Sequence, residues 1–252
     1  MPTIYMDDKK ELPARSALDY YRTEQTLIDE ILPVEMGYGS FDILDPGCGD
    51  GRWGRTAVRV SGYASTRLVT VDIDPKWNPY GDRALLETYG SIEFDHIEQN
   101  FTSQNFLKKN LTPFDYAVGN PPYGPSVKGV EKTQKIFDVH DWGIVPEGMG
   151  SITTAEIFIR QSWDLLRPHG KIIFLLESQF ASSMDRYYGL WNTHAPIRQW
   201  VCSRRPSFYS RGTNATEFSI FVWEKDEQGK NCGTPRCWPV QLFMYEREKL
   251  GA

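Results

Sequence analysis

The tetrapeptide Asn120-Pro121-Pro122-Tyr123 follows directly on an apolar segment, 115–119, and combines groups that could do chemistry. Two adjacent prolines restrict the backbone and remove two N–H donors. The turn therefore presents carbonyl oxygens and the Asn120 side chain as a rigid set of acceptors, and Tyr123 adds a ring for stacking. The Asn120 side-chain oxygen and the Pro121 carbonyl could hold both hydrogens of a planar amino group and turn its nitrogen into a nucleophile by positioning alone. A simple proline turn after a strand is the alternative.

The segment Asp45-Pro-Gly-Cys-Gly-Asp-Gly51 also follows a short apolar stretch, 41–44. Glycines such as Gly47 and Gly49 let the backbone turn sharply and lie against a ligand with no Cβ in the way. The Asp45 carboxylate suits a cationic amino group better than a phosphate, and no GxxxxGK[ST] phosphate loop is present. A tight strand-to-helix turn without a ligand is the alternative interpretation.

Two further segments carry suitable side chains after apolar stretches. Asp72 ends the stretch 67–72 and is placed to accept both hydroxyls of a ribose, and Ile73 beside it offers an apolar surface for an adenine ring. Asn100 provides an amide for the adenine edge, with the Phe101 ring packed against it. The three segments together predict a nucleoside-containing ligand with a positively charged end.

Alternating strands and helices must position these residues. Apolar periodicity predicts strands at 41–44, 67–72, 92–97, 115–119 and 170–176 and helices at 24–32, 52–60, 82–89 and 154–166. The segments 197–203 and 216–223 predict an antiparallel pair at one edge, and 238–245 could add an edge strand. We therefore predict a Rossmann-like α/β fold with a mostly parallel sheet of seven strands. Ligands of such sheets bind beyond the carboxyl ends of the strands, where the strand order reverses.

The cofactor-binding motifs of Rossmann-like S-adenosylmethionine methyltransferases are similar to three segments of this chain, which follow in the same order: DPGCGDG, VDID and QNF. The resemblance implies S-adenosylmethionine as cofactor, with its methionine part on the glycine-rich segment and its ribose on Asp72. Asn100 stands where the family often has Asp. NPPY resembles the signature shared by adenine-N6 methyltransferases of DNA and RNA and by enzymes that methylate a protein glutamine amide. Adenine N6 in nucleic acid, with DNA favoured over RNA, is the expected target, and a protein glutamine is the alternative.

Two flanking segments resemble the gamma-type adenine-N6 DNA methyltransferases. The segment Asp19-Tyr-Tyr-Arg-Thr-Glu24 is similar to one in which a Thr contacts the methionine part, which assigns that role to Thr23, although Glu24 replaces the usual Pro. Arg205-Pro-Ser-Phe208 resembles the region that places a ring against a flipped base. A flipped adenine would then lie between Tyr123 and Phe208. Tyr209 competes for this role, and Phe208 as a core residue is the other alternative.

Composition bounds the remaining expectations. The net charge of −5 means that nucleic-acid binding would depend on local basic patches such as 108–109, 128–135 and 204–211, each of which could equally be a solvated face. The long segment 124–152, with Lys128, is expected to close over the substrate. Cys232 and Cys237 lack a second Cys/His pair of zinc spacing, so no metal is expected.

The chain is expected to form one catalytic domain over 1–252, with a core at 19–224 and a tail at 225–252. A separate reader of base edges does not fit in that tail, so we expect weak sequence preference or recognition lent by a partner protein. The polar N-terminus and the lack of a long apolar run predict no membrane span and a cytoplasmic location in a bacterial or phage-infected cell.

Overall fold

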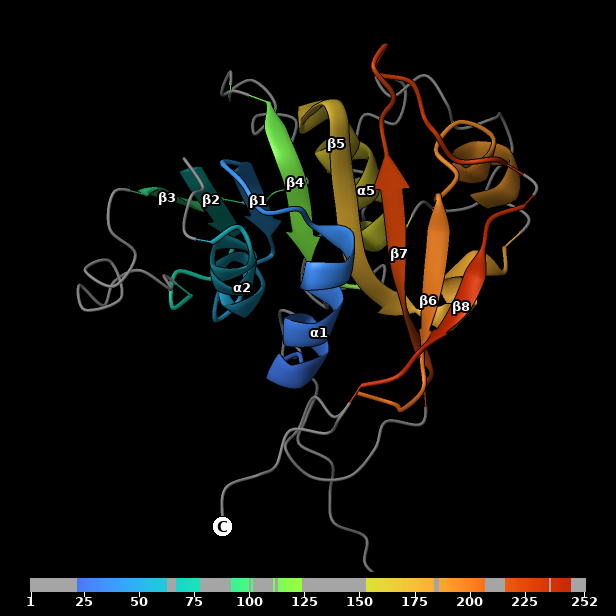
Figure 1. Ribbon diagram of the computed structural model, residues 1–252, viewed down its shortest axis with the longest axis horizontal. Helices are drawn as coiled ribbons and strands as arrows, with labels where there is room; N and C mark the ends of the chain where they lie inside the picture. Colours follow the sequence, from blue (N-terminus) through green and yellow to red (C-terminus); the bar gives the residue numbers. More distant parts are fainter. Residues whose placement is uncertain are drawn as a thin grey trace, which may run out of the picture.

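The protein is built around one twisted sheet with helices on both faces (Figure 1). The structure, a computed structural model, describes residues 22–62, 67–77, 92–99, 101, 111, 113–123, 153–183, 186–206, 216–235 and 237–245. In this part of the chain eight strands form the sheet, in the order β3-β2-β1-β4-β5-β7-β6-β8. The Rossmann-like α/β fold predicted from the sequence is confirmed.

Five strands form the parallel part of the sheet. They are β1 (Asp42–Pro46), β2 (Arg67–Asp72), β3 (Glu93–Glu98), β4 (Phe114–Gly119) and β5 (Leu166–Glu177). β1 pairs in parallel with both β2 and β4. On one side of β1 the chain adds β2 and then β3, and on the other side it later adds β4 and then β5. The strand order therefore reverses between β1 and β4, which is where ligands of open α/β sheets bind.

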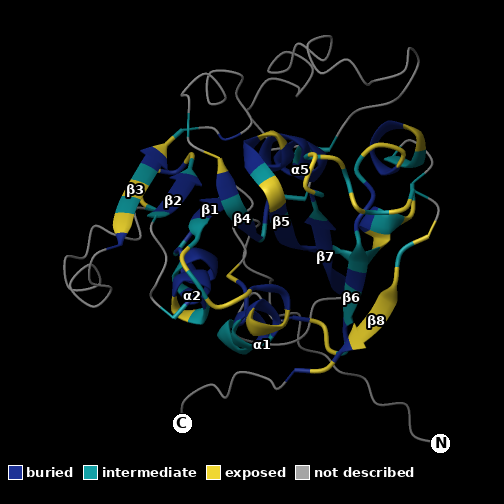
Figure 2. Ribbon diagram, turned by 45° about the horizontal axis from the view of Figure 1, so that its top comes forward, coloured by how far each residue is buried: buried dark blue, intermediate teal, exposed yellow. Residues whose placement is uncertain are grey.

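The other three strands complete the sheet beyond β5. They are β6 (Arg198–Cys202), β7 (Phe218–Glu224) and β8 (Val240–Phe243). β7 is antiparallel to β6, as predicted, and also to β5, whereas β8 is parallel to β6. The sheet thus has eight strands rather than seven, because the segment 238–245 does add an edge strand. The antiparallel pair therefore lies one strand in from the edge, and β8 is the more exposed border (Figure 2).

Two separate cores lie on the two faces of the sheet (Figure 2). Helices α1 (Gln25–Glu35) and α2 (Arg52–Val60) cover one face, and α5 (Thr154–Leu165) covers the other. Successive residues of a strand alternate between the cores: Ile43 of β1 packs under α1 and α2, whereas Leu44 packs under α5. Burial on both faces explains why the central strands are nearly continuous apolar runs.

The end of α1 differs from the prediction. Pro33 was expected just past the helix, but the helix continues to Glu35 and contains it. Glu35 is buried, accepts the indole N–H of Trp200 at 2.6 Å, and lies 3.3 Å from Arg198 Nε. These contacts with β6 hold the last turn in place although Pro33 cannot donate a backbone hydrogen bond.

Shorter elements follow β5, namely the 3-10 helix η3 (Ser178–Ala181) and a π-helical turn, η4 (Tyr187–Trp191). The predicted helix at 82–89 and the segment 124–152 lie outside the described residues. Among the helices that the structure describes, none is both long and apolar enough to span a membrane.

Candidate functional site

The site lies at the carboxyl edge of the sheet, where β1, β2 and β4 end beside one another. Residues 45–51, here called the glycine loop, connect β1 to α2. Gly47, Gly49 and Gly51 have φ values of 68°, 50° and 73°, in the left-handed region that glycine adopts without strain. A Cβ placed on Gly47 would lie 3.3 Å from Phe158 Cε1 and 3.7 Å from Pro122 Cδ. The glycine loop therefore lies directly against residues 120–123, here called the NPPY turn.

Asp45 contributes a buried carboxylate that is only half satisfied. Its side chain is 1% exposed, and Oδ2 accepts the Gly54 N–H at 2.8 Å. Oδ1 is buried and has no hydrogen-bond partner among the described residues, and a Cβ on Gly119 would lie 3.4 Å from it. Burial raises the pKa of Asp45 well above its usual value, and the Gly54 N–H opposes this only in part. A cationic group would satisfy Oδ1 and stabilise the ionised carboxylate.

Asp72 lies at the end of β2 and is tied to the glycine loop. Its Oδ2 accepts the Gly49 N–H at 2.9 Å and its Oδ1 accepts the Asp74 N–H at 2.9 Å. Burial raises the pKa of Asp72, and the two backbone donors oppose the shift. Each carboxylate oxygen keeps a further lone pair, so the carboxylate can still accept two hydroxyl groups. The backbone contacts fix its orientation in advance.

Apolar side chains stand beside Asp72. Ile73 is 48% exposed, as an apolar surface open to a ligand must be. Phe101 is buried, and its ring centroid lies 4.9 Å from that of Phe158, the residue that borders Gly47. Asn100, predicted beside them, lies outside the described residues.

The NPPY turn begins where β4 ends. Asn120 Nδ2 donates to Thr23 Oγ1 at 3.2 Å, and Asn120 Oδ1 accepts from the Tyr123 hydroxyl. The Tyr123 ring packs on Phe218 at the start of β7, with centroids 5.6 Å apart and planes inclined at 49°. Phe218 was not predicted as a site residue, because only the sheet order reveals that β7 begins at the carboxyl end of β5, one strand away from β4. Phe208 and Lys128, the other predicted substrate residues, lie outside the described residues.

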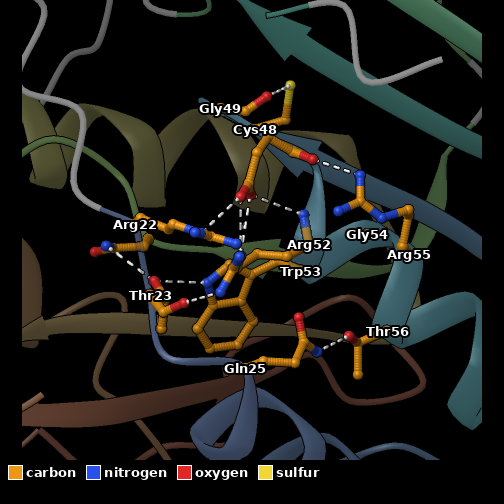
Figure 3. Close-up of polar contacts among 12 residues, drawn as sticks. Arg22, Thr23, Gln25, Cys48, Gly49, Arg52, Trp53, Gly54, Arg55 and Thr56 are labelled. Atoms are coloured by element: carbon orange, nitrogen blue, oxygen red, sulfur yellow. Dashed lines mark hydrogen bonds and ion pairs between the residues drawn. The ribbon is translucent and has the colours of Figure 1, made fainter. Parts of the chain in front are cut away.

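Thr23 links the NPPY turn to the glycine loop (Figure 3). It is 2% exposed, and its Oγ1 also accepts the Trp53 indole N–H at 3.2 Å. Its carbonyl accepts from Arg52 Nη1 at 2.5 Å, and Arg52 Nε lies 3.0 Å from Asp50 Oδ2. Sequence analysis singled out Thr23 but missed Trp53 and Arg52, although both directly follow the glycine loop and so had to lie near its ligand.

These residues fit S-adenosylmethionine. Asp45 Oδ1 is a buried, unsatisfied acceptor suited to an ammonium group, and the left-handed glycines leave room for a chain beside the backbone. Asp72 suits a ribose diol, and the exposed Ile73 beside it in the sequence offers an apolar surface for a base. When bound, this cofactor supplies an electrophilic methyl group. The fold and this site define the class as an S-adenosylmethionine-dependent methyltransferase, as the sequence predicted.

Comparison with solved structures supports the fold. A class I S-adenosylmethionine-dependent methyltransferase from Listeria monocytogenes superimposes with a TM-score of 0.58 at 16% identity, over 87% of this chain and 63% of that one. The methyltransferase subunit of a type I restriction-modification system from Streptococcus thermophilus gives 0.63 at 13% identity, over 85% and 50%. DrdV, solved as a complex with DNA, gives 0.63 at 13% identity, over 91% and 28%. The chain thus spans between about a quarter and two thirds of these proteins.

The family follows from the sequence itself. Residues 71–198, slightly more than half of the chain, match the sequence model of the Eco57I restriction-modification methylase family. The chain belongs to this family, and S-adenosylmethionine is its cofactor. No curated protein matches the sequence.

Proposed function

We propose that this protein transfers a methyl group from S-adenosylmethionine to the exocyclic N6 of adenine in DNA. The observation that carries the proposal is the position of the NPPY turn. Pro122 Cδ is 3.7 Å from a Cβ placed on Gly47, and Gly119, immediately before Asn120, adjoins the Asp45 carboxylate. An amino group held by Asn120 would therefore lie beside the cofactor.

The chemistry requires orientation more than proton transfer. The amino nitrogen of adenine is a weak nucleophile because its lone pair is delocalised into the ring. In the proposed reaction, Asn120 Oδ1 and the Pro121 carbonyl accept the two amino hydrogens, and the lone pair points at the methyl carbon. An N–C bond forms as the S–C bond breaks, the sulfonium becomes a thioether, and the nitrogen afterwards releases one proton to water. Positioning of this kind accounts for a large part of such rate enhancements.

Several observations favour DNA as the substrate. The family is one of restriction-modification methylases, and DrdV, which shares the fold, was solved with DNA. β6 runs parallel to β4, so Arg204 and Arg205 after β6 lie at the same sheet edge as the NPPY turn, and both are exposed. Exposed arginines at this edge suit contact with phosphates flanking a flipped base.

Two sequence-based assignments belong to this proposal. Phe208, in the segment that joins β6 to β7, would pack on the flipped adenine opposite Tyr123. Lys128, in the segment after the NPPY turn, would contact the DNA backbone. Contacts of this kind with a flipped adenine and the DNA backbone would still need another group to recognise the surrounding base sequence. Because the chain spans 50% of the Streptococcus thermophilus restriction-modification subunit and 28% of DrdV, we assign that task to a partner protein.

The test supplies methyl-labelled S-adenosylmethionine with duplex DNA, single-stranded DNA, RNA and a glutamine-containing protein substrate. Products are digested to nucleosides or amino acids and identified by mass spectrometry. We expect label in N6-methyladenine from DNA, and its loss in Asn120→Ala but not in Asn192→Ala, which removes an exposed asparagine outside the site. Label in RNA alone or in glutamine alone would overturn the proposed substrate, and unchanged labelling by Asn120→Ala would overturn the proposed chemistry.

A further inference from the structure

A single hydroxyl group connects the two halves of the site. Thr23 Oγ1 lies 3.2 Å from Asn120 Nδ2 in the NPPY turn and 3.2 Å from Trp53 Nε1 in α2, the helix that follows the glycine loop. Thr23 and Trp53 are 2% and 3% exposed, so water does not compete effectively for these hydrogen bonds. Both contacts join residues far apart in the sequence.

The two ends of the Asn120 amide are not equivalent for the proposed reaction. Only the oxygen can accept a hydrogen from an amino group, whereas the NH2 end would bring two donors together. With Nδ2 bound to Thr23, the oxygen is directed away from Thr23 and toward the Tyr123 hydroxyl. In the orientation that the structure shows, the contact with Thr23 holds Nδ2 and leaves Oδ1 on the side where an amino group could donate to it.

Trp53 determines where the Thr23 oxygen lies. An indole N–H can only donate, so the Thr23 side chain must turn its oxygen, and not its methyl group, toward Trp53. A β-branched side chain has few rotamers, and one strong contact is enough to select among them. Arg52 holds the Thr23 backbone by donating to its carbonyl at 2.5 Å. Figure 3 shows Thr23 held in this way by consecutive residues at the start of α2.

We infer that Thr23 and Trp53 are positioning residues, which hold the Asn120 amide with its oxygen toward the substrate amino group. The inference rests on the proposed function for its catalytic consequence, but the orientation of the amide can be tested without any substrate. It assigns to Thr23 a role beyond contact with the cofactor, and it gives Trp53 a role in the reaction.

The first experiment observes the amide directly. In ¹H–¹⁵N spectra of the whole protein, the Asn120 side-chain signals are those that disappear in Asn120→Asp. Thr23→Val keeps the shape but removes the acceptor, and Trp53→Phe removes only the indole N–H. We expect both variants to move the Asn120 signals, Thr23→Ser to leave them nearly in place, and Trp223→Phe to leave them unchanged. Trp223 is the matched control, because its buried indole donates to the His194 carbonyl on the other face of the sheet.

The second experiment measures single-turnover methyl transfer at saturating cofactor. We expect Thr23→Val to lower the rate by about tenfold to a hundredfold, the effect of losing one buried hydrogen bond, with a smaller loss in Trp53→Phe. The dissociation constant for DNA should stay within about twofold, since neither residue is placed to contact DNA. Thr23→Ser should restore most of the rate.

The outcomes separate the two proposals. If Thr23→Val leaves the Asn120 signals unmoved, the inference is wrong whatever the enzyme methylates. A wild-type rate in Thr23→Val at saturating cofactor would also overturn it, because the contact with Asn120 would then have no catalytic consequence. If the signals move as expected but wild-type protein methylates no adenine, the positioning of the amide stands and the proposed function fails.

Discussion

Asp45→Asn isolates the charge that the site buries. Asparagine has nearly the same shape and still accepts the Gly54 N–H, but it carries no charge. Burial raises the pKa of Asp45, so the folded protein holds this proton more tightly than the unfolded chain does. The contribution of this group to stability is thus fully present below the unfolded pKa and is lost as pH rises through the folded pKa. Wherever the wild-type carboxyl is ionised, the folded protein carries the cost of a buried charge, and the variant does not.

The magnitudes predict a reversal on cofactor binding. Without cofactor, Asp45→Asn should be more stable by about 1–3 kcal/mol, because an unpartnered buried amide costs less than an unpartnered buried charge, which corresponds to a Tm higher by about 2–12 °C. Cofactor at a hundred times its Kd should stabilise the wild type by about 2.7 kcal/mol. Removing one partner of a buried ion pair costs about 3–5 kcal/mol, so the variant should lose cofactor affinity by at least about a hundredfold and show almost no cofactor-induced shift.

Thermal unfolding with and without S-adenosylmethionine from pH 5 to pH 8, together with calorimetric titration of the cofactor, tests this reasoning. The variant should melt higher without cofactor, and the difference should shrink as the pH falls and the wild-type carboxyl becomes protonated. A variant that melts lower than wild type at every pH, or that binds the cofactor equally well, would refute the assignment of Asp45 as the acceptor for a cationic group.

Three other variants test the packing of α2 on β2, the exposed arginines after β6, and the NPPY turn. Gly54→Ala places a Cβ 2.9 Å from Leu68 Cδ1, where α2 packs on β2, so we expect a loss of about 1–3 kcal/mol in urea unfolding. Arg204→Ala with Arg205→Ala should weaken DNA binding and reduce the slope of log K against log salt by about 1 for each phosphate that is no longer neutralised. Tyr123→Phe keeps the ring but removes the donor to Asn120, and should lower the single-turnover rate by about tenfold.

The first two of these have a control within the chain. Gly37→Ala meets only the Phe41 ring, at 3.6 Å, and should unfold like wild type. Arg59→Ala removes an exposed arginine in the last turn of α2, at the opposite end of that helix from the glycine loop, and should leave the salt dependence of DNA binding unchanged. Equal effects of a test variant and its control would contradict the corresponding prediction.

The sequence predicted some elements closely because local signals and tertiary contacts agree there. The helix at 52–60 and the strand at 67–72 have the predicted bounds, since glycines precede the first and an apolar run forms the second. The end of α1 was misjudged because Pro33 is a local stop signal, whereas the contacts of Glu35 with β6 are made by residues distant in sequence. The eighth strand was only a possibility in the sequence because a short, exposed edge strand has little apolar pattern of its own.

What the sequence determined by itself is the chemistry of single segments: an acceptor-rich proline turn, a glycine loop with a carboxylate, and an acid at the end of an apolar run. Which of these segments meet was decided by the tertiary structure. Parallel pairing of β1 with β2 and β4 aligns their carboxyl ends, and the packing of α1 and α2 brings Thr23 against both Trp53 and Asn120. Such contacts depend on strand order and helix placement, which result from the burial of whole apolar faces, and no local pattern of residues encodes them.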